Sequence, residues 1–187
     1  MSGRLLLVTT RAEKAEEARR LGFDVAQQAM ELPEPQALDP EEIVEAKARA
    51  AFARAGHAVL VEDSGLAVAA WRGFPGALVK WMETTVGLDG IARMLDAFPD
   101  RTATAVCVVA WFDGTSLGVG RGEVRGTIAA VPRGAGGFGW DRLFVPEGES
   151  RTFAEMAPAE KDRVSHRRRA WEALGRQRPE LVRTVKA

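Results

Sequence analysis

The chain has 187 residues, of which 46% are hydrophobic and 28% are charged, values typical of a globular protein with one sizeable core. Its 26 basic and 26 acidic side chains cancel, so no net charge draws it toward nucleic acid or a membrane. The apolar stretch at residues 5–8 is too short for a signal-peptide core or a membrane span. We therefore expect one cytoplasmic domain over residues 1–187, with neither nucleic acid nor a membrane as partner.

Strand and helix patterns alternate along the chain without a linker or an internal repeat. The first half predicts strands at 4–10, 23–29 and 58–63, helices at 12–22 and 39–56, and a Pro-rich loop at 31–40. The second half predicts helices at 76–87 and 87–100, two or three strands within 102–131, a Gly-rich loop with a short strand at 132–148, and a basic helix at 165–181. This order predicts an α/β fold with a mixed sheet.

Two adjacent acids, Glu62 and Asp63, close the apolar strand predicted at 58–63, and Ser64 and Gly65 follow. Neighbouring residues in a regular strand point to opposite faces, so the two acids could not act on one target from within it. We expect the strand to end here and the backbone to turn, so that both carboxylates reach one space. A divalent cation would offset their repulsion, and oxygen ligands beside a phosphate are typical of Mg²⁺. The alternative is a capped turn with exposed acids.

A second candidate is the segment 133–141, RGAGGFGWD, whose glycines allow the backbone to approach a ligand closely. Phe138 and Trp140 could stack on a base, and Asp141 could hydrogen-bond its edge. The alternative is a flexible loop with buried aromatic residues. The segment is not a Walker A loop, because no Gly-Lys-Ser/Thr follows.

Two further candidates lie at predicted helix starts. Ser165 can cap the last helix, and His166 and Arg167 then lie in its first turn, where the helix dipole disfavours cations. That conflict is resolved if both face a ligand; the alternatives are a solvated helix face or a nucleic-acid patch. Near the N-terminus, the segment 9–14, TTRAEK, suits a polyphosphate, although many surface helices begin in the same way.

Taken in order, the segments TTRAEK, ELPEPQ, EIVEAKARAA, VLVEDSGLAV, GFPGALVKWM, PRGAGGFGWD and FAEMAPAEKDRVSHRRRA resemble the inosine triphosphate pyrophosphatase family over residues 4–174. The resemblance implies two α/β lobes around a long mixed sheet, a nucleotide cleft between them, and a homodimer. It also implies Mg²⁺-dependent attack of water on ITP, dITP or XTP at the α–β phosphate link, which releases the nucleoside monophosphate and pyrophosphate.

The resemblance also implies a role for individual residues. Glu34 and Glu62 would hold the metal, with Asp63 as general base or further ligand. The catalytic and substrate-binding positions would be Thr9, Thr10, Arg11, Lys14, Lys47, Ser64, Lys80, Phe138, Gly139, Trp140, Asp141, Lys161, His166 and Arg167. Among these, Lys14 and Lys47 would act on the triphosphate, Phe138 would stack on the purine, and Lys161, His166 and Arg167 would read its 6-keto oxygen. Four of the five lysines fall on these positions, and the fifth is Lys186.

One position departs from the family pattern, which usually has Thr/Ser-Gly-Asn before its lysine where this chain has Thr9-Thr10-Arg11. Arg11 could grip the phosphates bidentately or fill part of the sugar-phosphate pocket. Two other functions stay open: a related-fold pyrophosphatase for other modified nucleotides, and a nucleotide-binding module with weak or no catalysis.

Overall fold

One mixed β-sheet forms the centre of the protein over residues 4–182, the part of the chain that this computed structural model describes. Within that range the sheet has seven strands in the order β2-β1-β3-β5-β6-β7, and β4 pairs with β3. The strands are β1 (Leu5–Val8), β2 (Val25–Gln28), β3 (Val59–Val68), β4 (Pro75–Gly76), β5 (Thr102–Phe112), β6 (Leu117–Ile128) and β7 (Phe144–Pro146). β1 runs parallel to β2 and β3, and the other neighbouring strands are antiparallel. The expected α/β fold with a mixed sheet is confirmed.

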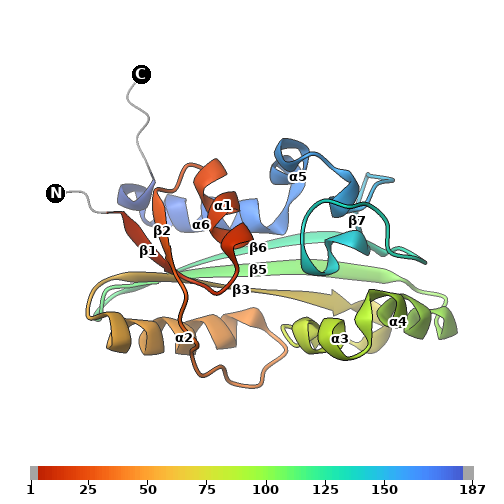
Figure 1. Ribbon diagram of the computed structural model, residues 1–187, viewed down its shortest axis with the longest axis horizontal. Coiled ribbons are helices and arrows are strands. Elements are labelled where there is room, and N and C mark those ends of the chain that lie inside the picture. Colours follow the sequence, from red (N-terminus) through yellow and green to blue (C-terminus); the bar gives the residue numbers. More distant parts are fainter. Residues whose placement is uncertain (1–3, 183–187) are drawn as a thin grey trace.

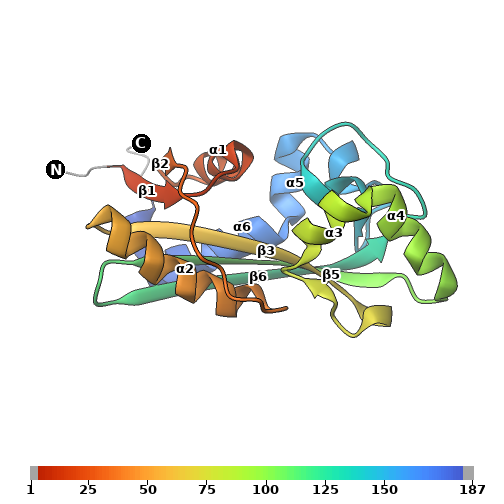
Figure 2. The same ribbon diagram turned by 60° about the horizontal axis from the view of Figure 1, so that its bottom comes forward.

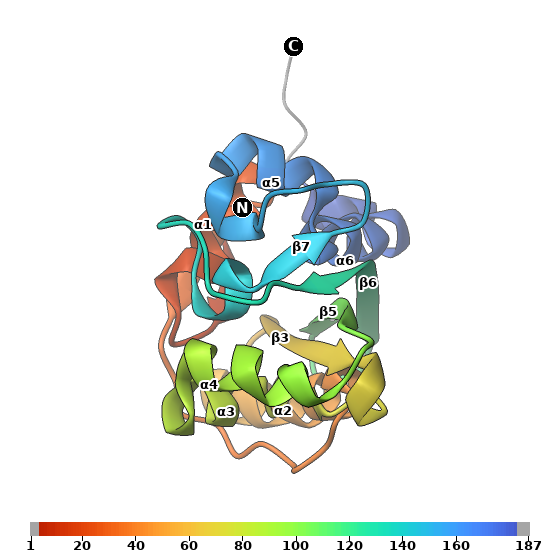
Figure 3. The same cartoon turned by 90° about the vertical axis from the view of Figure 1, so that its right-hand side faces the viewer.

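Helices cover both faces of this sheet, with α2, α3 and α4 on one side and α1, α5 and α6 on the other (Figure 1, Figure 3). Their bounds are α1 (Ala12–Arg20), α2 (Pro40–Ala55), α3 (Val79–Thr85), α4 (Gly87–Met94), α5 (Pro158–Val164) and α6 (His166–Gln177). The sequence pattern predicts all of these except α5, whose seven residues are too few to show a helical period. No helix of the described chain is long and apolar enough to cross a membrane.

The helix ends follow the chemistry that the sequence indicates. The Asp39 side chain caps α2 by accepting a hydrogen bond of 2.9 Å from the Glu41 amide, and Gly56 ends that helix with a φ of 70°. Ser165 caps α6, since its Oγ accepts a hydrogen bond of 3.1 Å from the Arg168 amide. The Asp39 cap therefore fixes the start of α2, and the Ser165 cap fixes the start of α6.

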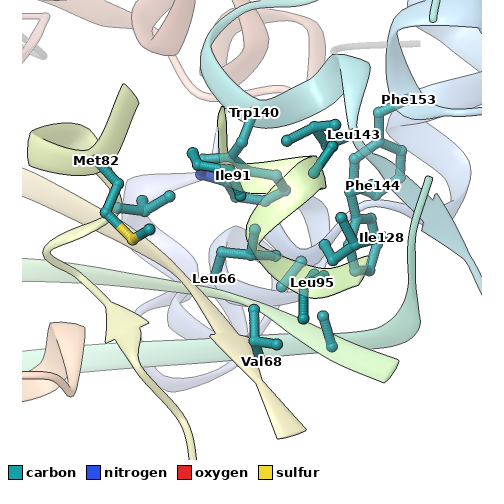
Figure 4. Close-up of a cluster of buried hydrophobic side chains, with 14 of the residues drawn as sticks. Leu66, Val68, Met82, Ile91, Leu95, Ile128, Trp140, Leu143, Phe144 and Phe153 are labelled. Carbon is teal, nitrogen blue, oxygen red and sulfur yellow. The ribbon is translucent and has the colours of Figure 1, made fainter. Parts of the chain in front are cut away.

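The core is divided by the alternation of strand residues. In β5, Val106, Val108, Ala110 and Phe112 belong to the apolar cluster under α2, whereas Cys107, Val109 and Trp111 belong to the cluster against α1 and α6. A third cluster fills the other end of the sheet, where α3 and α4 pack against Leu66, Ile128, Trp140 and Phe144 (Figure 4). The clusters under α2 and against α1 and α6 lie on the two faces of one end of the sheet, and the third cluster lies at the other end.

The expected turn at Ser64-Gly65 is wrong, because β3 continues without interruption to Val68 and pairs with β5 over its whole length. Gly65 is small for a different reason. A Cβ atom there would lie 2.6 Å from the Gly76 carbonyl carbon, so the glycine allows β4 to approach β3. Glu62 and Asp63 therefore lie in the middle of a regular strand and point to opposite faces.

The far edge of β3 is left open beside these two acids. β1 pairs with β3 only as far as Val61, and β4 begins to pair at Leu66. Residues 62–65 therefore pair only with β5 on one side, and their other edge is free for side chains or a ligand to approach. This gap fixes the position of the candidate site.

We expect Gly65→Ala to lower the free energy of unfolding by about 1–3 kcal/mol, because the added methyl group would push β4 away from β3. Urea unfolding followed by circular dichroism measures the change. Gly90→Ala in α4 is the control: its Cβ would meet the Val86 side chain, 3.1 Å away at the nearest atom, and not the backbone of a neighbouring strand, and alanine favours the helix. Equal stability of Gly65→Ala and wild type would contradict the close approach of β4.

Candidate active site

A cavity of about 630 Å³ opens at the gap along β3. The segments that line it are the β1–α1 turn, the Pro-rich loop, α2, β3, α3, the Gly-rich loop and the first turn of α6. Of the residues that the sequence analysis selected, its lining contains Thr9, Thr10, Arg11, Lys14, Glu34, Lys47, Asp63, Ser64, Lys80, Phe138, Gly139, Trp140, Asp141, His166 and Arg167. Glu62 and Lys161 lie behind the lining, each almost completely buried. Lys186 lies outside the described residues.

Asp63 points to the α2 side of the sheet, where Lys47 lies between it and Glu34. The Lys47 Nζ is 2.8 Å from a Glu34 carboxylate oxygen and 3.5 Å from Asp63 Oδ1. Burial raises the pKa of Asp63, and the attraction of Lys47 does not cancel this effect. Asp63 therefore accepts a proton more readily than an exposed aspartate does.

Lys14 and Lys47 bring two ammonium groups to the floor of the cavity. Both donate to the carbonyl oxygen of Glu62, at 3.4 Å each, on the free edge of β3. Burial alone would lower the pKa of Lys47, but Asp63 and Glu34 outweigh it and raise that pKa, so Lys47 stays charged. Two adjacent cations in a partly buried cavity form a binding site for an anion.

Glu62 points to the opposite face and is fully buried. Its carboxylate oxygens accept hydrogen bonds from Arg167 Nε, at 2.9 and 3.1 Å, and from Trp171 Nε1 at 3.0 Å, and Lys14 Nζ lies 3.4 Å away. Burial would raise the pKa of Glu62, but Arg167 and Lys14 lower it overall. Glu62 is thus an ionised anchor for two cavity cations, one in α1 and one in α6.

Glu17 forms a second buried anchor, which the sequence analysis missed. Its carboxylate accepts from Lys161 Nζ at 2.8 Å and from Arg167 Nη1. Lys161 also donates to Asp141 Oδ2 at 2.7 Å, and the same oxygen accepts from the Phe138 amide at 2.8 Å. The one available signal was its position three residues after Lys14, on the same face of α1. This network holds the Gly-rich loop against α1 and α6.

His166 stands out because it is 1% exposed and neither ring nitrogen has a hydrogen-bond partner among the described residues. The ring lies between Trp140 and Phe153, with centroid distances of 5.2 and 5.8 Å. Burial, followed by the charges of Arg167 and Lys161, holds the pKa of His166 well below its usual value, so the imidazole is neutral. A buried polar group without a partner is costly. Since His166 lines the cavity, a ligand can supply the missing hydrogen bond.

The two aromatic residues of the Gly-rich loop have different surroundings. Trp140 is 6% exposed and packs edge-on against Phe144, so it forms a wall of the core. Phe138 is half-buried and lines the cavity. Its ring centroid lies 5.0 Å from Lys161 Nζ, 5.2 Å from Arg167 Cζ and 5.6 Å from Arg11 Cζ. Phe138 is therefore the ring that a flat ligand can reach.

The carboxylates around the cavity suit a hard cation only in part. Glu34 and Asp63 lie on either side of Lys47, and both reach the cavity, whereas the hydrogen bonds of Glu62 engage both of its carboxylate oxygens. Among the described residues, no group of three or more His, Cys, Asp or Glu side chains is arranged to hold a metal ion. Two carboxylates are sufficient protein ligands for Mg²⁺ when phosphate oxygens and water complete its coordination.

Comparisons with known proteins agree with the fold and show the family. The model of the Ham1 family matches residues 5–177, and the chain belongs to this family. It is 44% identical over 171 residues to the dITP/XTP pyrophosphatase of Thermococcus kodakarensis, covering 89% of this chain and 92% of that relative. It is 38% identical to the inosine triphosphate pyrophosphatase of Yarrowia lipolytica, covering 91% and 93%. The expected family resemblance is confirmed.

Solved structures show the same fold. A HAM1 protein from Coxiella burnetii superposes with a TM-score of 0.82 at 28% identity, covering 95% of this chain and 98% of that one. The nucleoside-triphosphatase / dITP/XTP pyrophosphatase from Mycobacterium abscessus superposes with a TM-score of 0.69 at 34% identity, covering 93% and 98%. Each covers nearly the whole described chain.

We expect removal of the charge of Glu62 and of Asp63 to have different effects on the free energy of unfolding. Glu62→Gln removes a buried carboxylate that pairs with Arg167 and Lys14 and leaves Glu17 as the other partner of Arg167, so it lowers the free energy of unfolding by about 3 kcal/mol. Asp63→Asn removes a carboxylate whose ionisation burial already disfavours, so stability stays unchanged or rises. Urea unfolding of both variants measures this. A larger loss for Asp63→Asn than for Glu62→Gln would contradict the assignment.

Glu17 should contribute to the pH dependence of stability. Burial raises its pKa, but Arg167 and Lys161 outweigh this effect and lower the pKa from 4.5 to about 2. A carboxyl whose pKa is lower in the folded state stabilises it fully above pH 4.5 and loses that contribution as the pH falls to 2. We expect Glu17→Gln to reduce the decline in stability between pH 4.5 and 2, measured by thermal unfolding. An unchanged decline would show that folding does not lower the pKa of Glu17.

Proposed function

We propose that this protein hydrolyses ITP, dITP and XTP to the nucleoside monophosphate and pyrophosphate, with Mg²⁺. The observation that carries the proposal is the arrangement of the cavity. One end has two cations, Lys14 and Lys47, beside the carboxylates of Glu34 and Asp63. The other end has the half-buried ring of Phe138 and the unpartnered imidazole of His166. The first end suits a triphosphate and the second a purine, and the relatives bear the corresponding names.

The triphosphate end has more positive charge than Lys14 and Lys47 alone supply. Thr9 and Thr10 precede α1, so their hydroxyls and the free amides of its first turn can donate to phosphate oxygens. Lys80 is exposed on α3 and lines the cavity opposite. Together these groups can neutralise the charge that develops on a departing pyrophosphate.

Glu34 is the residue that we infer would hold Mg²⁺, with Asp63 as a further ligand where it does not act as the general base; phosphate oxygens and water would complete the coordination. The hydrogen bonds of Glu62 to Arg167 and Trp171 argue that its carboxylate acts through Lys14 and Arg167 instead of by direct coordination. When bound, the metal supplies charge neutralisation on the phosphate oxygens.

The reaction that we infer is attack of a water oxygen on the α-phosphorus. The bond from that phosphorus to the bridging oxygen breaks, and pyrophosphate leaves with the electron pair. Asp63 is our candidate for the general base that accepts the water proton, and its raised pKa matches this role better than that of an exposed aspartate. Lys14 and Lys47 hold the triphosphate in position while the bond breaks.

Selection of the base follows from the neutral state of His166. A neutral imidazole carries one N–H donor and one acceptor nitrogen, and the tautomer whose N–H faces the base can pair with the 6-keto oxygen of hypoxanthine or xanthine. In that tautomer, a 6-amino group in the same place would leave the N–H unpaired, at about 1–3 kcal/mol. Lys161 and Arg167 already bind Glu17, Asp141 and Glu62, so we infer that they orient the base-binding end. Gly139, Trp140 and Asp141 then form the wall beside Phe138, and Ser64 faces the cavity from β3.

The homodimer stays a prediction from the family resemblance, and the cytoplasmic location stays a prediction from the sequence composition. The proposed reaction depends on neither the oligomeric state nor the cellular location. Size-exclusion chromatography with light scattering measures the oligomeric state directly.

We expect release of pyrophosphate from ITP, dITP and XTP with Mg²⁺, and about 5- to 150-fold slower release from ATP, since its 6-amino group leaves the N–H of His166 unpaired at about 1–3 kcal/mol. EDTA should abolish release, and Asp63→Asn should reduce kcat by about 100-fold or more. A coupled pyrophosphate assay measures all three effects.

The exposed variant Glu172→Gln, far from the cavity lining, serves as control and should match wild type. Binding of ITP in Mg²⁺ without release of pyrophosphate would replace the proposal by a nucleotide-binding module. Faster hydrolysis of pyrimidine or methylated nucleotides would replace it by a related pyrophosphatase.

A further inference from the structure

An ion pair between Arg11 and Glu83 crosses the cavity, and Glu83 has no role in the function proposed above. Arg11 immediately precedes α1 and Glu83 lies in α3; the two helices lie on opposite faces of the sheet (Figure 3) and at different positions along it (Figure 2). The Arg11 Nη2 is 3.6 Å from Glu83 Oε2, and the two side chains are 34% and 13% exposed. Both side chains line the cavity.

The pair lies against the Gly-rich loop at the purine end. The Arg11 guanidinium carbon is 5.6 Å from the centroid of Phe138. A Cβ atom at Gly139 would lie 3.1 Å from Glu83 Oε1 and 3.3 Å from Arg11 Nη1, so the two side chains pack on the backbone of this glycine. Both side chains therefore contact the Gly-rich loop, which we expect to bind the purine.

The charges around Glu83 also separate it from the triphosphate end. Glu83 forms its ion pair with Arg11, at 3.6 Å. Glu34 and Asp63 instead pair with Lys47, at 2.8 and 3.5 Å. A half-buried carboxylate close to the phosphates would repel them, whereas at the purine end it can hold Arg11 in place.

We propose that Arg11 contacts the nucleoside part of the substrate and not its triphosphate, and that Glu83 is the positioning residue that holds Arg11 beside Phe138. This inference rests on the proposed function for the nature of the ligand. A guanidinium is planar and stacks on aromatic faces, and its remaining N–H groups can donate to the oxygens of the base or sugar. Arg11 would thus give this chain a purine contact at a position where the family usually has asparagine.

The test separates nucleoside binding from phosphate binding with two probes, ITP and inorganic tripolyphosphate. Arg11→Lys keeps the charge but loses the planar group, and a lysine serves well as a point charge for phosphate. We expect Arg11→Lys and Arg11→Ala to raise KM for ITP roughly tenfold, equivalent to about 1.4 kcal/mol, with little change in kcat. Inhibition by tripolyphosphate should stay within about twofold of wild type, since neither variant removes a phosphate contact.

Glu83→Gln tests the positioning role. We expect it to raise KM for ITP less than Arg11→Ala does, and the double variant to match Arg11→Ala alone, because both changes disturb one interaction. Glu172→Gln, which breaks the exposed ion pair with Arg168, is the matched control and should leave both probes unaffected. Melting temperatures of all variants report any loss of folding.

The inference is overturned if Arg11→Lys retains the wild-type KM while Arg11→Ala weakens tripolyphosphate inhibition tenfold, because Arg11 would then be a phosphate ligand. It is also overturned if the variants lower the melting temperature without changing KM, since the pair would then only join α1 to α3. Failure of the proposed function is a separate result: the wild type would release no pyrophosphate. Calorimetric dissociation constants for ITP and tripolyphosphate would still decide the role of Arg11.

Discussion

The site depends on the ion pairs and hydrogen bonds of the buried Glu62 carboxylate. A fully buried charge is costly unless its partners are close, and here Arg167, Trp171 and Lys14 surround it. These partners come from α6 and α1, so one residue of β3 joins three elements beneath the cavity. Glu17 extends the network to Lys161 and Asp141, which fixes the Gly-rich loop as well. One ionic network, centred on Glu62 and Glu17, therefore holds the first turns of α1 and α6 and the Gly-rich loop in place.

Strand geometry assigns different tasks to the two adjacent acids. Because successive side chains of β3 point to opposite faces, Glu62 enters the ionic network under α6 while Asp63 meets Lys47 of α2. The unpaired edge between β1 and β4 then exposes the Glu62 carbonyl oxygen, to which Lys14 and Lys47 both donate. One strand segment thus orients cations through its backbone and the buried carboxylate of Glu62, and it presents the carboxylate of Asp63 on the other face.

The cavity also separates charge from aromatic surface. Its floor combines lysines with carboxylates, and its far wall combines Phe138 with a neutral histidine whose ring nitrogens lack partners within residues 4–182. Such a polar group persists in a folded protein when a ligand completes its hydrogen bonds. The Arg11–Glu83 pair lies beside that wall and joins the start of α1 to α3.

The sequence by itself determined the α/β class, most helix and strand positions, the caps at Asp39 and Ser165, and the family, because these depend on local chemistry and on motifs in order. It also selected most of the cavity lining. Only the tertiary structure decided the roles of Glu62, Glu17 and Glu83, since each depends on partners distant in the chain. Local sequence suggested a turn at Ser64-Gly65, but the small residue there serves the approach of β4, and β3 continues through it. No local pattern reveals this pairing. Because it keeps β3 a regular strand through Glu62 and Asp63, the two side chains point to opposite faces.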